Sequence, residues 1–264
     1  MIGERVAVAT FVTVLVLGLA GCATLETQQQ STSQTQQFSE RELLNRLIQR
    51  NDRLRSLRSL AKISYRSGSE KGGFQGAIVV DRPDRLRLEA FSMFGTALVV
   101  TAAGNRVTGF YPSENRVYRG ESSRQNLFRY TQVLLDLKEL TSLLVGMPPI
   151  EADARWEVTR TFVQRRLRDG SLDIVELSTQ TGVPVRWERF ARTGAIQFSA
   201  VFQEFSKTSL GAFPLKISFA APALGRLVEV RYDEPEINAS LPDSVFIQNP
   251  PENATEVSLD ALGG

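Results

Sequence analysis

The chain has 264 residues, 42% of them hydrophobic, a formal net charge of +2 at pH 7 and no His. The absence of His excludes imidazole zinc sites, Ser–His and Cys–His nucleophile pairs and the usual general base near neutral pH. The small net charge, with Arg spread along the chain, gives nucleic-acid binding little support.

Residues 1–21 have the pattern of a secretory signal peptide. A single basic residue, Arg5, precedes an apolar run over residues 6–19, and small residues close the segment. The run is shorter than the roughly 20 apolar residues that a membrane-spanning helix needs. We therefore expect this segment to be removed after export.

The signal peptide leads into residues 19–22, which read Leu-Ala-Gly-Cys. This ending resembles the lipobox of bacterial lipoproteins. The resemblance implies that Cys22 is acylated and becomes the first residue of the mature chain, and that Ala23 directs it to the outer membrane. Cys22 is also the only cysteine, so we expect no internal disulfide and a domain held together by its core.

Residues 22–37 are rich in Gln, Ser and Thr and predict a flexible linker behind the acylated Cys22. A coil of this length reaches roughly 20 Å. The expected organisation continues with one folded domain over residues 38–250 and a polar C-terminal tail over residues 251–264. The body would then sit on or near a bilayer surface.

The folded domain is expected to begin with a helix over residues 40–53. Ser39 and Glu42 match a capping box. Apolar residues then recur at helical spacing, beginning with Leu43 and Leu47.

Antiparallel strands are expected next. A first strand over residues 57–66 and a turn over residues 68–73 lead into residues 76–104, whose alternation predicts three consecutive strands. Residues 105–111 and 115–119 then predict a further hairpin.

The loop over residues 91–95 does not fit an ordinary hairpin. It carries large apolar side chains, including Met93 and Phe94, where polar turn residues are usual. Such a loop either folds back onto a core edge or offers an apolar tip to something outside. The residues of the loop leave both alternatives open.

The period then changes from strand to helix and back. Ser123 caps an expected helix toward Thr131, and Asp136 caps a second one that ends near Gly146. The later expected strands cover residues 156–165, 172–178, 183–191, 195–205, 213–221 and 226–232, with a short strand within residues 241–246.

These elements predict an α+β fold that is mostly antiparallel β. About eleven strands in meander order form a sheet that curls into an open half-barrel, with helices covering its concave face. A hydrophobic pocket is expected between the helices and the sheet. Its expected lining is Ile78, Val80, Leu86, Leu88, Leu98, Val100, Phe198, Phe202 and Phe219.

Catalysis has little support in the sequence. No Gly-x-Ser-x-Gly elbow and no phosphate-cradling glycine loop occurs. Neighbouring carboxylates, such as Asp81 with Asp84 or Asp233 with Glu236, stand near Pro and are expected to be solvated turn residues. We therefore expect no enzyme, no catalytic residues, no cofactor and no metal site.

The chain resembles the LolA/LolB family of lipoprotein-localisation factors, and within it the LolB outer-membrane receptors. The resemblance covers roughly residues 43–149. It rests on the lipobox, the Arg-Leu-Arg-Leu strand at residues 85–88, the Met-Phe-Gly-Thr loop at residues 93–96, and the helix that ends in Leu-Leu-Val-Gly-Met-Pro at residues 143–148. Met93 departs from the family pattern, which has Pro at this position.

The resemblance implies an open half-barrel with a helical lid and a cavity for acyl chains. It also implies that Phe94, with Met93 beside it, inserts into the membrane during delivery. The expected function is a membrane-anchored lipoprotein that binds acyl chains or lipoproteins and helps insert them into the outer membrane, with a periplasmic carrier protein as a partner. The alternative is a non-enzymatic envelope protein that uses the same fold to bind a protein partner.

Overall fold

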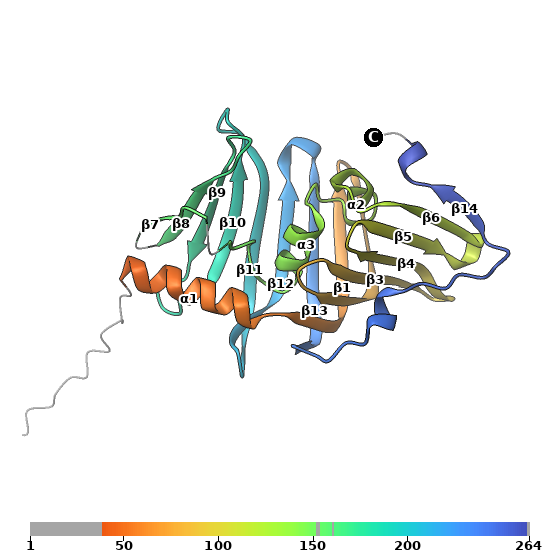
Figure 1. The fold of residues 1–264 in the computed structure, drawn as a ribbon, viewed down its shortest axis with the longest axis horizontal. Coiled ribbons are helices and arrows are strands. Elements are labelled where there is room, and N and C mark those ends of the chain that lie inside the picture. Colours follow the sequence, from red (N-terminus) through yellow and green to blue (C-terminus); the bar gives the residue numbers. More distant parts are fainter. Residues whose placement is uncertain (1–38, 152–153, 160, 263–264) are drawn as a thin grey trace, which may run out of the picture. The chain divides into compact units, whose positions relative to one another are not determined.

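The structure, a computed structural model, describes residues 39–151, 154–159 and 161–262 (Figure 1). The expected signal peptide, Cys22 and the linker up to residue 37 lie outside these ranges. Within the described part, none of the helices is both long enough and apolar enough to cross a membrane.

Residues 36–264 form one compact unit, which we call the folded body. Its buried apolar residues extend from Leu43 to Leu259 and belong largely to a single cluster. All residues of this cluster lie within the folded body.

Helix α1 (Glu40–Arg53) begins as the sequence predicts. The Ser39 hydroxyl accepts a hydrogen bond from the Glu42 amide at 3.3 Å, and the Glu42 carboxylate accepts one from the Ser39 amide at 2.9 Å. These reciprocal bonds satisfy two amide groups of the first turn. Leu43 and Leu47 are buried, and they fasten the helix to the core.

A single sheet of fourteen strands makes up most of the folded body. The first half contains β1 (Ser56–Ser67), β2 (Glu70–Asp81), β3 (Arg85–Ser92), β4 (Gly95–Ala103), β5 (Arg106–Tyr111) and β6 (Arg116–Glu121). The second half contains β7 (Glu157–Val158), β8 (Phe162–Arg166), β9 (Leu172–Leu177), β10 (Pro184–Phe190), β11 (Ile196–Thr208), β12 (Gly211–Ala221) and β13 (Arg226–Ile237). The last strand is β14 (Thr255–Ser258).

The strand order is β14-β6-β5-β4-β3-β2-β1-β13-β12-β11-β10-β9-β8-β7. Each half is thus a meander, and the two halves meet where β1 pairs antiparallel with β13. All pairs are antiparallel except β14 with β6. The curled sheet stays unclosed, with β14 and β7 at its two edges (Figure 1), which confirms the predicted open and mostly antiparallel architecture.

The two halves are connected by residues 122–151, which we call the lid segment. It contains α2 (Arg124–Thr131) and α3 (Leu137–Leu144), and the sheet curls around α3 (Figure 1). All residues of α3 except Lys138 are buried. A helix enclosed in this way needs a partner for each polar group, because burying an unpaired one is unfavourable.

Hydrogen bonds hold α3 to both halves of the sheet. The Thr141 hydroxyl donates to the Pro83 carbonyl at 2.6 Å, in the turn between β2 and β3. The Tyr232 hydroxyl on β13 donates to the Leu144 carbonyl at 2.7 Å. The middle and the C-terminal end of α3 are therefore each tied to a different half of the sheet.

Several predicted strands differ from the structure. The short strand expected within residues 241–246 is wrong, because the 3₁₀ helix η3 (Asp243–Phe246) stands there and buries Phe246. The turn expected around Asp233 and Glu236 is also wrong, since both lie in β13. Glu234 has a φ of 46° beside a register shift in the β1 pairing, and this bulge accommodates Pro235 within the strand.

Two further strand boundaries were misplaced. The strand expected over residues 156–165 divides into β7 and β8. The turn expected over residues 68–73 ends earlier, since β2 begins at Glu70. Gly72 lies in that strand opposite Tyr65 of β1. A Cβ at this position would lie 2.5 Å from the Tyr65 hydroxyl, so glycine leaves room for that side chain.

Candidate functional site

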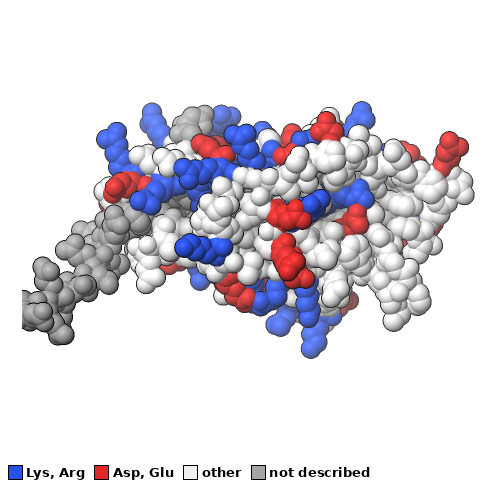
Figure 2. Space-filling model, turned by 90° about the horizontal axis from the view of Figure 1, so that it is seen from below, with Lys and Arg blue, Asp and Glu red and all other residues white. Residues whose placement is uncertain are grey.

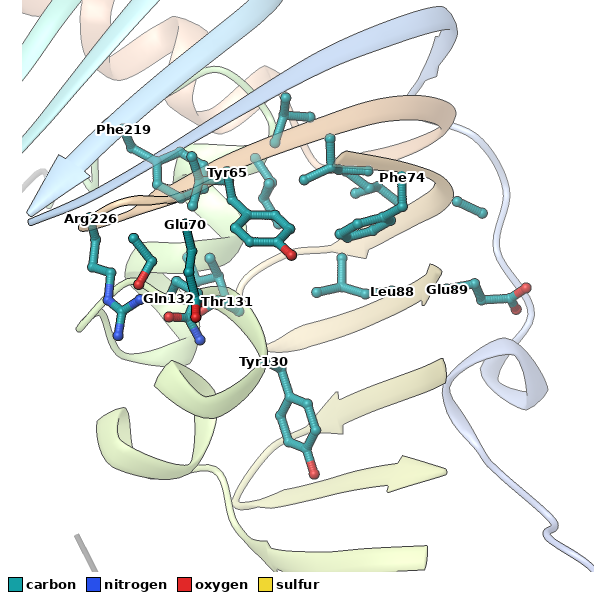
Figure 3. A pocket seen from close by; sticks show the side chains of 18 residues that line it. Tyr65, Glu70, Phe74, Leu88, Glu89, Tyr130, Thr131, Gln132, Phe219 and Arg226 are labelled. Atoms are coloured by element: carbon teal, nitrogen blue, oxygen red, sulfur yellow. The ribbon is translucent and has the colours of Figure 1, made fainter. Parts of the chain in front are cut away.

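The candidate site is a cavity of about 460 Å³ between the sheet and the lid segment (Figure 3). Small-ligand sites generally occupy about 300–1,000 Å³. Helix α3 contributes Leu140 and Leu144, and strands of both halves contribute most of the apolar wall. Its main sheet residues are Ile63, Ile78, Leu88, Phe219, Val228 and Val230.

The apolar wall follows from strand alternation across neighbouring strands. Side chains of one face recur every second residue, and residues opposite each other on paired strands lie side by side. Ile63 pairs with Val230, Ile78 pairs with Leu88, and Phe219 pairs with Val228. Three strand pairs therefore place apolar side chains against one another at the cavity.

Three of the nine side chains predicted to line the cavity do so, namely Ile78, Leu88 and Phe219. The other six do not line it. Val80, Leu86, Val100, Phe198 and Phe202 are buried in the core, and Leu98 is half-buried against it. Alternation identifies the face of a strand that is apolar, but it does not show where another element covers that face.

The sequence analysis missed other lining residues, although their strands and helix were predicted. Ile63 lies in the predicted strand over residues 57–66, and Val228 lies in the one over residues 226–232. Leu140 and Leu144 belong to the apolar side of the predicted second helix. The alternation and the helical spacing were thus the signals that pointed to them.

The loop between β3 and β4 points outward. The side chains of Met93 and Phe94 are 87% and 92% exposed, and we call these two residues the apolar tip. The Ser92 hydroxyl accepts a hydrogen bond from the Phe94 amide at 3.2 Å and donates to the Gly95 carbonyl at 3.0 Å. Gly95 has a φ of 112°, a conformation that favours glycine. Of the two alternatives for this loop, the structure therefore has the exposed one.

The apolar tip lies near one end of the cavity. Gln75 on β2 pairs with Phe91 on β3, and the preceding residue, Phe74, lines the cavity. The Phe74 side chain is 38% exposed. Phe74, an apolar residue at the rim of the cavity, therefore lies near the end of β3 that leads into the turn with Phe94.

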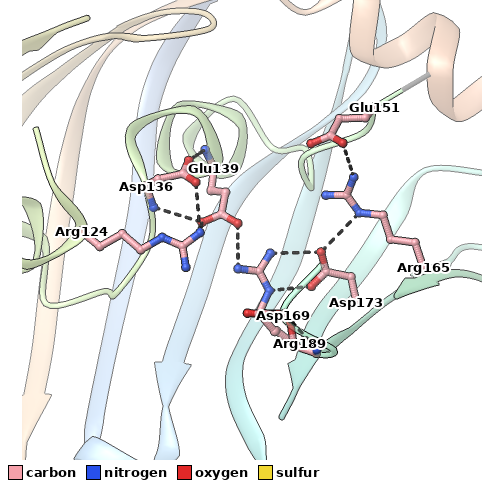
Figure 4. Close-up of polar contacts among 9 residues, drawn as sticks. Arg124, Asp136, Glu139, Glu151, Arg165, Asp169, Asp173 and Arg189 are labelled. Atoms are coloured by element: carbon pink, nitrogen blue, oxygen red, sulfur yellow. Dashed lines mark hydrogen bonds and ion pairs between the residues drawn. The ribbon is translucent and has the colours of Figure 1, made fainter. Parts of the chain in front are cut away.

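Charged residues bind the lid segment to the second half of the sheet (Figure 4). Glu139 on α3 pairs with Arg189 on β10 at 2.7 Å, and Arg189 forms two hydrogen bonds with Asp173 on β9, at 2.7 and 3.0 Å. Asp173 also lies 3.6 Å from Arg165 on β8. The contacts run from Glu139 through Arg189 and Asp173 to Arg165. The network therefore joins strands β8, β9 and β10 to α3.

The charges of this network are shielded from water. The side chains of Arg165, Asp173 and Arg189 are at most 5% exposed. Burial alone opposes the charged form of Arg189, but the hydrogen bond and charge of Asp173, together with Glu139, raise the pKa of its guanidinium. Arg189 therefore stays protonated.

Polar and titratable side chains also line the cavity. Burial raises the pKa of Tyr130, so its hydroxyl stays neutral. Among the described residues, no group of three or more His, Cys, Asp or Glu side chains is placed to hold a metal ion.

Figure 2 shows acidic and basic side chains interspersed over the face seen from below, with a broad uncharged area at its right-hand end.

Comparison with known proteins identifies the fold. No protein-family model matches the sequence, and no curated protein matches it. A domain described as an outer membrane lipoprotein-sorting protein from Vibrio parahaemolyticus is similar, with a TM-score of 0.56 at 12% identity over 79% of this chain and 97% of that chain. A DUF1329 family protein from Desulfovibrio piger has a TM-score of 0.56 at 12% identity, with the same coverage.

A LolA superfamily protein from Nitrosomonas europaea is similar to the same extent. Its TM-score is 0.55 at 12% identity, over 80% of this chain and 98% of that chain. All three are similar to this chain over nearly their whole length. The chain therefore has a LolA-like fold.

Proposed function

We propose that this chain is a membrane-anchored bacterial lipoprotein that binds acyl chains or lipoproteins in its cavity and helps insert them into the outer membrane. The single observation that carries this proposal is the pairing of a largely apolar cavity with an exposed apolar tip near one end of it. The likeness to a lipoprotein-sorting domain and to a LolA superfamily protein supports it.

The cavity suits hydrocarbon better than it suits water. Most of its wall is apolar, although the charged residues Glu70, Glu89 and Arg226 also line it. Hydrocarbon gains about 0.8 kcal/mol for each methylene that leaves water. If a water-sized group takes about 30 Å³, the volume holds roughly 15 such groups. One acyl chain of about this number of methylene groups fits this space.

The apolar tip supplies a contact with the bilayer. Burial of a large apolar side chain contributes about 1.5–3 kcal/mol, so Met93 and Phe94 together dock the folded body without fixing it permanently. Acyl chains cross water only at high cost, and delivery is easier when the cavity empties directly into lipid. The tip lies in the turn between β3 and β4, and β3 contributes Leu88 to the wall of the cavity.

The remaining steps of the proposal rest on the sequence. An acylated Cys22 and the linker behind it would hold the folded body beside the membrane, and several acyl chains anchor a protein far more firmly than one. The resemblance to LolB receptors adds a periplasmic carrier that hands over the cargo. The alternative of a protein-binding envelope factor requires a cavity filled by the protein's own side chains, and the open volume of about 460 Å³ argues against it.

A transfer experiment tests the proposal. A lipoprotein is loaded on a soluble carrier, and its transfer to liposomes is followed with the anchored protein and with Phe94→Glu. We expect this variant to fold normally and to lose transfer, because a carboxylate at the tip opposes insertion into lipid. Leu224→Glu is the matched control and should transfer normally. It introduces the same charge at a half-exposed apolar side chain in η2 (Pro222–Leu224), away from the tip. Unchanged transfer by Phe94→Glu refutes the role of the tip.

A further inference from the structure

The cavity has a polar end as well as an apolar one. The first residues of β2 and β13, the last residues of β1 and the end of α2 meet there (Figure 3). Ser67 pairs with Glu70 on one side and with Arg226 on the other. These pairings place a cation and an anion on strands that flank the same residue, at the mouth of an otherwise apolar space.

Arg226 has no partner at this mouth. Its backbone is paired within the sheet, but within the described part of the chain its side chain makes no hydrogen bond or ion pair, and its Nε atom is buried without a hydrogen-bond partner. Arg50, Arg82 and Arg165 also have a buried Nε atom without a partner. Their terminal nitrogens are engaged, however, with the Ala212 carbonyl, the Asn51 and Leu54 carbonyls and the Glu151 carboxylate respectively. A buried donor without an acceptor is unfavourable, and an acceptor on a ligand would satisfy it.

Glu70 restricts which acceptor fits. Its carboxylate lies at the same end of the cavity as Arg226 (Figure 3), but the two form no ion pair. Arg226 therefore remains available to an anion, while Glu70 repels one. The balance favours a headgroup of low charge whose anionic oxygens reach the guanidinium, and it disfavours a headgroup with several negative charges.

We infer that the cavity binds a single-chain amphiphile with an anionic oxygen headgroup, a carboxylate or a phosphate, and that Arg226 is the residue that binds this headgroup. The acyl chain then extends from the polar end along Val228 and Phe219 toward Phe74. This inference rests on the proposed acyl-binding function and narrows it to a class of ligand. It also explains why an arginine without a partner stands at the rim of a hydrocarbon site.

Competition binding on the folded body, residues 36–264, tests the inference. The probes displace a bound fluorescent acyl chain, and they are hexadecanoate, single-chain lysophosphatidate and the uncharged monoacylglycerol of the same chain length. We expect Arg226→Gln to weaken the binding of the anionic probes by about tenfold or more, the loss of a hydrogen bond to a charged group. Binding of monoacylglycerol should be unchanged.

Two further variants sharpen the test. Glu70→Gln should tighten the binding of the anionic probes by roughly twofold to fivefold, because it removes a like charge at an exposed position. Arg66→Gln is the matched control. Arg66 lies on the neighbouring strand and lines a pocket on the other face of the sheet, so the same change of charge there should affect no probe.

Each result has a distinct meaning. If only the carboxylate or only the phosphate responds to Arg226→Gln, the inference holds and the headgroup is identified. If wild type binds all three probes equally and Arg226→Gln changes none, the headgroup role is overturned while acyl binding stands. If Arg226→Gln weakens monoacylglycerol equally, the residue shapes the cavity and the role is again overturned. If wild type binds no probe, the proposed function itself fails.

Discussion

The carboxylate of Glu139 on the lid helix lies 2.7 Å from the guanidinium of Arg189 on β10. This contact joins the segment that covers the cavity to strands that are distant from the cavity. On the other side of α3, the Tyr232 hydroxyl holds the Leu144 carbonyl. The position of α3, and therefore the volume beneath it, depends on two polar contacts made by different parts of the sheet.

Replacing Arg189 with Met should destabilise the folded body strongly. The change removes the cation that Asp173 and Glu139 share, and leaves Asp173 with Arg165 at 3.6 Å and Glu139 with the part-exposed Arg124 at 3.1 Å. Breaking a buried ion pair generally costs about 3–5 kcal/mol. The free energy of unfolding in urea measures this loss. Arg186→Met, on the same strand, is the control because the Arg186 side chain is 43% exposed and its pairs with Glu176 and Glu188 are long; we expect less than about 1 kcal/mol there. Equal losses for the two variants would show that the network does not stabilise the lid.

Alkaline pH should weaken the fold through buried tyrosines. Burial raises the pKa of Tyr232 and of Tyr130 above the usual value of about 10. Their contribution is therefore fully present below pH 10, and it is lost as the pH rises further because only the unfolded chain ionises readily. Tyr232→Phe should make the free energy of unfolding less dependent on pH above 10. The same slope in wild type and variant would contradict this.

The same Tyr232→Phe variant should lose stability at neutral pH. It leaves the buried Leu144 carbonyl without its hydrogen bond, which costs about 1–3 kcal/mol. Urea unfolding at pH 7 gives the number, with Tyr65→Phe as the control, since the Tyr65 side chain is 39% exposed. A loss no larger than that of the control would mean that the bond contributes little.

The C-terminal strand should contribute to the core through Leu259. This residue is 2% exposed, follows β14 and approaches Gly120 on β6. Leu259→Ala should destabilise the folded body by about 2–5 kcal/mol, the range for a buried leucine. Leu262→Ala, at a side chain that is 50% exposed, should change stability by less than about 0.5 kcal/mol. A negligible effect at Leu259 would mean that β14 is an independent appendage.

Local chemistry explains which parts of the fold could be predicted. The capping boxes at Ser39 and Asp136 place the starts of α1 and α3 within their own first turns. Alternation likewise predicts most of the strands. These signals depend on residues a few positions apart, so the sequence contains them in full.

Non-local contacts explain the rest. The β1–β13 pairing joins Leu57 to Ile237, and β14 joins β6 as a parallel strand; neither leaves a pattern within its own segment. That the Arg226 side chain lacks a partner at the mouth of the cavity could not be predicted, because its surroundings come from three strands and α2. The extent of the cavity depends on which part of the sheet the lid segment covers. Leu86 and Leu88 lie on the same face of β3, yet Leu86 is packed in the core and Leu88 lines the cavity.

The most direct test of the account is to fill the cavity and measure acyl binding. Titration of the folded body with a fluorescent acyl chain should give one site in wild type, and Val228→Trp, which directs an indole into the cavity, should weaken that site by tenfold or more. Leu88→Trp, from another strand of the wall, should act in the same way. Leu227→Trp adds the same ring to the neighbouring position, which lines a pocket on the other face, and should bind as wild type does. Binding that is equal in Val228→Trp and Leu227→Trp, with both variants folded, would contradict the claim that this cavity holds an acyl chain.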